Sequence, residues 1–286
     1  MPAASCFFNN RTGLRLHYLR HGQGSGIPVV LLHGLRAYAQ TWDNLVHALG
    51  EGFDCIALDQ RGRGASDWAA SDSYRTEVYV QDLEDLVSHL GFERFVLIGH
   101  SLGGANALEY VRCNPGRVSA LVIEDIGPGS SSQGDGAARI RREMAETPLR
   151  FDDWAAAEGF WRTSRPGLSA EGLASRLRHS MKALGQGVVW RHDQQGIAQA
   201  RLNIQPTDLW PAVLALDCPT LFVRGGRSDF LPAAMLEEMR KRNPRVATVV
   251  VPDASHYVHD DQSEVFNREV LAFLDATDVG QKTINR

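Results

Sequence analysis

Phe95–Val111 reads FVLIGHSLGGANALEYV. Four apolar residues, typical of a buried strand, lead directly into Gly99, and a helix-forming run follows Gly103. Ser101 therefore lies in a tight strand-to-helix turn, where side chains two residues before or after the serine would collide. Such a turn lifts the hydroxyl clear of the sheet and aims the free amides of a helix N-terminus beside it. The pattern predicts a nucleophile elbow with Ser101 as the nucleophile.

Nearly continuous apolar runs recur along the chain, as expected of parallel strands covered on both faces. They are Val29–Leu32, Cys55–Leu58, Phe95–Ile98, Val118–Ile123, Thr220–Val223 and Ala247–Val251. Helix-like stretches alternate with them at Trp42–Leu49, Val78–Leu90, Leu102–Cys113, Pro232–Arg242 and Ser263–Ala276. Phe7–Asn10 and Leu14–Leu19 flank a turn and predict an opening antiparallel hairpin. The fold class is therefore α/β, with a mostly parallel, doubly wound sheet of about eight strands.

One segment interrupts this alternation. Residues 127–216 contain no clear strand but several helical patterns, at Arg139–Glu146, Asp153–Thr163, Ser169–Leu184 and Leu209–Leu216. An insertion of this length is too long for a simple loop in a compact domain. We expect residues 1–126 and 217–286 to form the core domain. Residues 127–216 are then inserted as a helical cap, or lid, over the carboxyl edge of the sheet.

The composition resembles that of an ordinary globular enzyme, with 43% hydrophobic and 22% charged residues. A net charge of −4, without a long basic or acidic run, gives no electrostatic footprint for nucleic acid or an anionic membrane. No apolar run approaches membrane-spanning length, and the N-terminus lacks the pattern of a secretory signal. The four scattered cysteines favour small buried side chains in a reducing compartment. We expect a cytoplasmic protein without a nucleic-acid or membrane partner.

A serine hydroxyl is a poor nucleophile unless a base removes its proton and a carboxylate orients that base. His256 lies just after the last predicted strand and before the last predicted helix, where the chain returns to the carboxyl edge of the sheet. This position favours His256 as the base. The run His256–Asp261 is typical of a cluster that caps a helix start, so we expect no metal site there.

Two aspartates are candidates for the carboxylate. Asp229 follows the strand Thr220–Val223 and completes the chain order serine, acid, histidine, so we expect it to be the acid. Asp125 ends the strand that follows the elbow's helix and is the alternative. As an alternative role, the aspartate that is not the acid could still tune the histidine or cap a turn.

The oxyanion of an acyl transfer needs two preorganised donors. The backbone amide of Leu102 is the first candidate because it follows the nucleophile at the start of a helix. The second should come from the loop after Val29–Leu32, where the backbone amide of Leu35 is our choice. Only backbone amides are required, so the apolar side chains do not matter.

These residues resemble the α/β-hydrolase family over nearly the whole chain. Besides the elbow, the resemblance rests on His33-Gly34, on the turn Asp59–Ser66 and on the spacing of Asp229 and His256. In similar proteins the start of that turn is structural, and Arg61 is buried in hydrogen bonds. The resemblance implies a serine hydrolase of the carboxylesterase or lactonase branch, with a helical cap and without a metal or organic cofactor.

Ser101 stands where dehalogenases and epoxide hydrolases of this fold carry an aspartate. The resemblance therefore implies hydrolysis of a carboxylic ester, lactone or amide of a small molecule through an acyl-enzyme on Ser101. Some relatives that cleave small acidic amides or enol-lactones take their acid from the position of Asp125, which keeps these substrates as an alternative. A carbon–carbon bond hydrolase is another alternative, and a ligand receptor or signalling protein that retains the triad is the non-enzymatic one.

Substrate-binding residues are expected in the cap and beside the oxyanion loop. Trp161 and Trp190 supply aromatic bulk, and Arg36 adjoins Leu35. An arginine that points inward would bind a substrate carboxylate in bidentate fashion, which predicts an acidic substrate. The predicted cap holds many arginines, which are Arg139, Arg141, Arg142, Arg162, Arg165, Arg176, Arg178 and Arg191. The sequence leaves open whether two copies pair as a homodimer.

Overall fold

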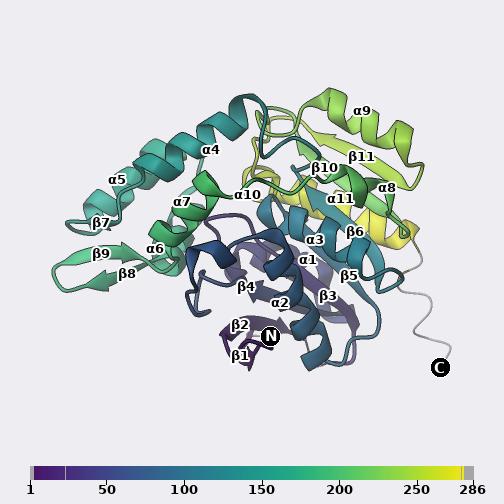
Figure 1. Cartoon of the computed structure of the whole chain (residues 1–286), viewed down its shortest axis with the longest axis horizontal. Coiled ribbons are helices and arrows are strands. Elements are labelled where there is room, and N and C mark those ends of the chain that lie inside the picture. Colours follow the sequence, from purple (N-terminus) through teal and green to yellow (C-terminus); the bar gives the residue numbers. More distant parts are fainter. Residues whose placement is uncertain (1–2, 23, 278, 280–286) are drawn as a thin grey trace.

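The computed structural model describes residues 3–22, 24–277 and 279. The strands of its main sheet are Ala4–Asn9 (β1), Arg15–His21 (β2), Ile27–Leu32 (β3), Phe53–Asp59 (β4), Phe95–His100 (β5), Val118–Glu124 (β6), Thr220–Gly225 (β10) and Val246–Val251 (β11). They lie in the order β1-β2-β4-β3-β5-β6-β10-β11 (Figure 1). β1 and β2 form the predicted antiparallel hairpin. The other six strands, β4-β3-β5-β6-β10-β11, run parallel to one another. The prediction of a mostly parallel sheet of about eight strands is confirmed.

Helices cover both faces of this sheet. They are Asp43–Leu49 (α1), Thr76–His89 (α2), Leu102–Cys113 (α3), Ala233–Arg242 (α9) and Ser263–Ala276 (α11), with the single turn Val258–Asp261 (α10) and short 3-10 turns at Ala39–Trp42, Gly50–Gly52 and Ser71–Ser73. Successive strand residues alternate between the faces: Val30 and Leu32 pack with α2, α3 and α9, whereas Val29 and Leu31 pack with α1 and α11. This two-sided burial explains why the strands are almost purely apolar.

The insertion between β6 and β10 differs from the prediction because it is not entirely helical. Its elements are Gly134–Glu146 (α4), Arg150–Phe151 (β7), Trp154–Ser164 (α5), Ala170–Ser180 (α6), Met181–Leu184 (β8), Gly187–Trp190 (β9), Gln194–Asn203 (α7) and Trp210–Leu214 (α8). The expected helix Ser169–Leu184 is wrong beyond Ser180. Gly185 has a φ of 60° and turns the chain back, so that β8 pairs with β9 in a small sheet of order β7-β9-β8.

The insertion packs in two ways. Its outer part, with α5, α6 and the small sheet, projects beyond the main sheet in Figure 1 and has its own core, which includes Phe151, Trp161 and Trp190. Its inner helices α4 and α7 instead bury Ile140 and Ile197 in the main core. The insertion is therefore anchored on the core, while the domain boundaries at residues 127 and 216 stay a prediction.

The cysteine prediction is only partly confirmed. Cys55 and Cys218 are buried and Cys6 is partly buried, but Cys113 is exposed at the end of α3. All four are free thiols. Across the described part of the chain, we find no helix with both the length and the apolar character needed to cross a membrane.

Candidate active site

Ser101 connects β5 to α3 with a backbone conformation that side chains rarely adopt, φ 51° and ψ −111°. The flanking glycines make this turn possible. A Cβ at Gly99 would lie 2.5 Å from the carbonyl oxygen of Gly103, and a Cβ at Gly103 would collide with the carbonyl of Leu32. The serine amide donates to the carbonyl of Glu124 at 2.9 Å, which fixes the turn against β6. The predicted elbow is thus present in full.

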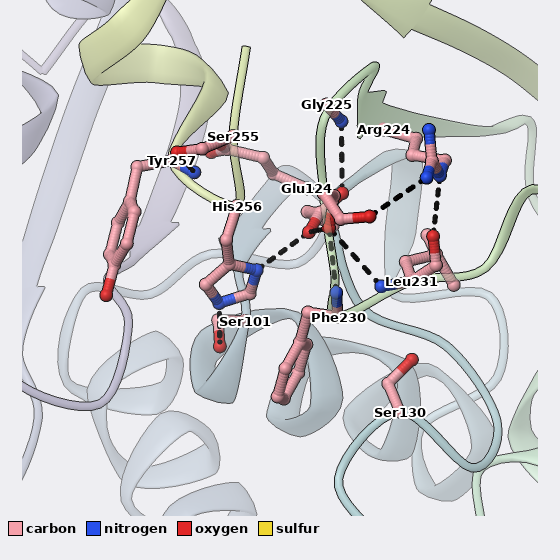
Figure 2. Close-up of polar contacts among 12 residues, drawn as sticks. Ser101, Glu124, Ser130, Arg224, Gly225, Phe230, Leu231, Ser255, His256 and Tyr257 are labelled. Carbon is pink, nitrogen blue, oxygen red and sulfur yellow. Dashed lines mark hydrogen bonds and ion pairs between the residues drawn. The ribbon is translucent and has the colours of Figure 1, made fainter. Parts of the chain in front are cut away.

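His256 lies in the loop after β11, and its ring points at the elbow (Figure 2). Nε2 is 3.0 Å from the Oγ of Ser101. The ring of Phe230 packs against the imidazole, with centroids 4.5 Å apart. Burial keeps the pKa of His100 well below its ordinary value, so this neutral ring donates an N–H to the main-chain carbonyl of His256 at 2.9 Å. The position of His256 is therefore fixed through both its ring and its backbone.

Asp125, and not Asp229, contacts the other ring nitrogen of His256. The distance from Asp125 Oδ2 to Nδ1 is 2.7 Å, and the carboxylate is completely buried. It also accepts hydrogen bonds from the hydroxyl of Ser228 and from the amide of Gly225, the latter at 3.0 Å. The expectation for Asp229 as the histidine's partner is wrong, because Ser228 occupies the position in the β10 turn next to the Asp125 carboxylate.

Asp229 instead joins the core to the insertion. Its carboxylate binds Arg139 of α4 through two hydrogen bonds of 2.8 and 2.9 Å. The Arg139 guanidinium holds the pKa of Asp229 below its ordinary value, although burial acts in the opposite direction.

The loop that carries Leu35 lies beside the nucleophile, and Leu35 and Leu102 both line the cavity around Ser101. Leu102 is the first residue of α3, so its N–H lacks an acceptor within the helix. The Leu35 amide also has no acceptor among the described residues. Both amides are thus available as donors, and their role in an oxyanion hole stays a prediction.

The turn after β4 holds this loop. The Gln60 side chain donates to the carbonyl of His33 at 2.6 Å and accepts from Asn106 of α3 at 2.7 Å. The fully buried Arg63 donates from Nε to the carbonyl of Leu35 at 3.1 Å. The turn therefore links the loop to helix α3, a connection that the sequence did not reveal.

Arg61, in the same turn, matches its expectation as a structural residue. Its guanidinium binds Asp82 of α2 at 2.6 and 2.7 Å, and both side chains are buried. The ion pair ties the turn to α2.

Ser101 and His256 open into a cavity of about 330 Å³. Trp161 lines this cavity, as expected. Arg36 also lines it, but its guanidinium is bound to Glu143 and Thr147 of the insertion.

Trp190 is not among the residues that line this cavity. The side chain is buried in the outer core of the insertion, where its indole N–H donates to the carbonyl of Pro148 at 2.7 Å. The expectation that Trp190 binds substrate is therefore wrong.

Two of the cap arginines named from the sequence, Arg165 and Arg176, line the cavity beside Tyr257. The guanidinium carbon of Arg165 lies 3.5 Å from the centre of the Tyr257 ring. Arg176 is buried and forms an ion pair with Asp260. Burial and the charge of Arg176 both lower the pKa of Arg165.

His100, Glu124 and His259 form a buried cluster behind His256, with potential ligand atoms within 4.8 Å of one another. The Glu124 carboxylate accepts from the His259 ring at 2.8 Å and from its amide at 3.0 Å. Burial lowers the pKa of His259, but Glu124 and Asp260 outweigh it and raise the pKa. Glu124 and His259 bond to each other and Nε2 of His100 bonds to His256, whereas Nδ1 of His100 has no hydrogen-bond partner among the described residues and faces the backbone of Gly34. We interpret the cluster as support for the loop.

Comparisons with known proteins identify the family to which the chain belongs. Residues 27–263 match the alpha/beta hydrolase fold family. The 2-(acetamidomethylene)succinate hydrolase of Mesorhizobium japonicum is 28% identical over 89% of this chain and 90% of its own length. The N-formylmaleamate deformylase of Pseudomonas putida is 27% identical over 92% of this chain and 94% of its own.

Solved structures give the same result. The crystal structure of E-2-(acetamidomethylene)succinate hydrolase covers 96% of this chain and 100% of its own, with a TM-score of 0.86 and 26% identity. These relatives are hydrolases, which supports hydrolase activity here. The chain belongs to the alpha/beta hydrolase fold family.

Proposed function

We propose that the protein is a serine hydrolase that cleaves a carboxylic ester, lactone or amide of a small molecule through an acyl-enzyme on Ser101. The observation that carries this proposal is one continuous chain of hydrogen bonds. It runs from Ser101 Oγ to His256 Nε2 at 3.0 Å and from His256 Nδ1 to Asp125 at 2.7 Å. Because Ser101 lies in the wall of a cavity, a substrate carbonyl can reach its hydroxyl.

Acylation follows from this arrangement. The Oγ of Ser101 attacks the substrate carbonyl carbon while Nε2 of His256 takes the hydroxyl proton. The backbone amides of Leu102 and Leu35 stabilise the oxyanion of the tetrahedral intermediate. When the bond to the leaving group breaks, His256 returns the proton to the departing oxygen or nitrogen.

Deacylation repeats these steps with water. His256 removes a proton from the attacking water, the acyl–Oγ bond breaks, and the proton returns to Ser101. Asp125 stays ionised throughout, holds Nδ1 protonated and stabilises the imidazolium. Its hydrogen bonds from Ser228 and Gly225 fix the carboxylate while it does so.

Small acidic amides are the substrate class that the available observations favour. Some similar proteins that cleave small acidic amides or enol-lactones take their acid from the position of Asp125, and Asp125 is the residue that contacts His256. The names of the two relatives also contain succinate and maleamate, both of which bear carboxylates.

Labelling with a fluorophosphonate tests the proposal directly. Wild-type protein should gain one covalent label, detected by mass spectrometry, and should hydrolyse p-nitrophenyl esters of graded chain length with repeated turnover. Ser101→Ala should abolish labelling and lower kcat by about 10⁶-fold, because the nucleophile is lost. An unlabelled wild-type protein, or one that releases a single equivalent of product and keeps it bound, would contradict the proposal and favour a ligand receptor.

A further inference from the structure

Six arginines line the cavity, and their guanidinium groups differ in their partners. Arg36 and Arg176 each bind a carboxylate directly, at Glu143 and Asp260. Arg165 makes only longer contacts of this kind. Its Nη2 donates to Asp261 at 3.4 Å and lies 3.6 Å from an oxygen of Asp260. The six are Arg36, Arg63, Arg75, Arg165, Arg176 and Arg201.

The other three arginines are occupied or solvated. Arg63 is completely buried and is bonded to main-chain carbonyls and to the hydroxyl of Tyr79. Arg201 donates to the carbonyl of Ser131 at 2.6 Å, and Arg75 is exposed. Among the described residues that line the cavity, Arg165 is therefore the mostly buried arginine with the longest hydrogen bond to a protein acceptor, 3.4 Å from Nη2 to Asp261.

The two aspartates near Arg165 are engaged elsewhere. Asp261 accepts hydrogen bonds from the amide and the hydroxyl of Ser255, the former at 2.8 Å. Asp260 is shared with Arg176 and with the ring of His259. Nε and Nη1 of Arg165 donate to no atom of the described residues, and the side chain is only 13% exposed. A mostly buried guanidinium in this state is electrostatically favourable for an incoming anion.

The location of Arg165 puts such an anion beside the reaction centre. Its guanidinium carbon lies over the ring of Tyr257, the residue that follows His256, 3.5 Å from the ring centre. Figure 2 shows Tyr257 and His256 side by side, and their ring centroids are 5.1 Å apart. The stacking holds the planar fork in one orientation, which is the condition for bidentate binding of a carboxylate. One aromatic ring separates the guanidinium from the proposed base.

We propose that Arg165 binds a carboxylate of the substrate, so that the enzyme selects short esters or amides that carry a second, ionised carboxyl group. This inference rests on the proposed hydrolase function and names its substrate class. Tyr257 orients the guanidinium, and the substrate carboxylate supplies the bonds that Asp260 and Asp261 leave unmade. Arg176 adds positive charge nearby but keeps its own partner.

A matched pair of esters tests this assignment. Monoethyl succinate carries the carboxylate, and ethyl 4-oxopentanoate has the same chain length with a ketone in its place. We expect wild-type kcat/KM to favour the anionic ester by about 100-fold, because two charge-assisted hydrogen bonds are made to it alone. An equal kcat/KM for the two esters would overturn the proposal without any variant.

Three variants locate the preference. Arg165→Met should reduce the ratio of the two kcat/KM values to near one, and Arg165→Lys should retain part of it because the charge stays but the fork is lost. Arg162→Met is the matched control: it removes an exposed arginine of α5 that is paired with Glu158, and the ratio should not change. If Arg165→Met keeps the full preference, Arg165 is not the binding residue.

The same experiment separates the two proposals. Fluorophosphonate labelling of Ser101 reports the hydrolase function without needing a carboxylate. Labelled protein that hydrolyses both esters equally would overturn the assignment of Arg165 alone, whereas protein that is neither labelled nor active would overturn the hydrolase function itself. Succinate and succinamide, used as competitive inhibitors of p-nitrophenyl acetate hydrolysis by the wild type, give a second readout: equal inhibition constants would also contradict the role of Arg165.

Discussion

Asp125 and Asp229 follow neighbouring parallel strands at the same edge of the sheet, but they belong to different regions. Asp125 is 0% exposed and is bonded only within the core, to His256, Ser228 and Gly225. The Asp229 side chain is 38% exposed and is bound to Arg139 of the insertion. The core alone therefore supplies every residue of the Ser101–His256–Asp125 hydrogen-bonded chain. Asp229, at the edge of the core, instead uses its charge to bind the insertion.

The largest expected effect separates these two regions directly. Asp125→Asn should lower kcat by about 10⁴-fold, because an amide no longer holds Nδ1 protonated or stabilises the imidazolium. Asp229→Asn, the matched substitution at the interface, should change kcat by less than about fivefold, since it removes only a partly exposed ion pair. Steady-state kinetics with one p-nitrophenyl ester checks both, with circular dichroism as the control for folding. If Asp229→Asn lowers kcat more than Asp125→Asn does, Asp229 and not Asp125 is the acid that supports His256.

A third carboxylate, Asp260, sharpens the comparison through its pH dependence. Burial raises its pKa, but Arg176, His259 and Arg165 outweigh burial and bring the pKa to about 2. A depressed carboxyl pKa stabilises the native state fully above the unfolded-state value and loses that effect as the pH falls toward 2. The difference from the ordinary value corresponds to about 2 kcal/mol.

The measurement is the free energy of unfolding of wild type and Asp260→Asn between pH 7 and pH 2.5. The advantage of the wild type should not decline between pH 7 and pH 5, because Asp260 also raises the pKa of His259, and it should shrink only below about pH 4. An advantage that already declines between pH 6 and pH 5 would show that the neighbouring arginines do not hold Asp260 in its ionised form.

The smallest effect belongs to the pair of Asp229 and Arg139. Both side chains are partly exposed, so solvent screens their attraction, and their coupling should contribute less than about 1 kcal/mol to stability. A double-mutant cycle with Asp229→Asn and Arg139→Met, followed by thermal unfolding at low and high salt, measures it. A coupling free energy above this value that does not change with salt would show that solvent does not screen the Asp229–Arg139 pair, and would contradict the comparison with the buried Asp125.

The core could be predicted almost completely from the sequence because its signals are local. The run Phe95–Ile98 must be a strand, and Gly99 and Gly103 permit one turn, so the bounds of α3 were predicted at both ends. The insertion lacks such signals. Met181–Leu184 fits a helix or a strand equally well until Gly185 reverses the chain, and α7 was missed because it includes a glycine and few apolar residues.

Ser101 and His256 could be predicted because each lies just after a strand of the sheet, and the carboxyl ends of parallel strands meet at one edge. The choice between the two aspartates could not be predicted in this way, because the direction of a side chain after a strand depends on a backbone angle such as the φ of 51° at Asp125. Arg165 was one of many arginines, and only its tertiary contact with Tyr257 distinguishes it.

Gln60 gives the site a mechanical property. A single side-chain amide accepts from Asn106 in α3 and donates to the carbonyl of His33 in the loop before Leu35. The two backbone segments that face the nucleophile are thereby spaced by one rigid, planar group rather than by two independent loops. We therefore expect the helix and the loop to move together, so that the gap between them changes little.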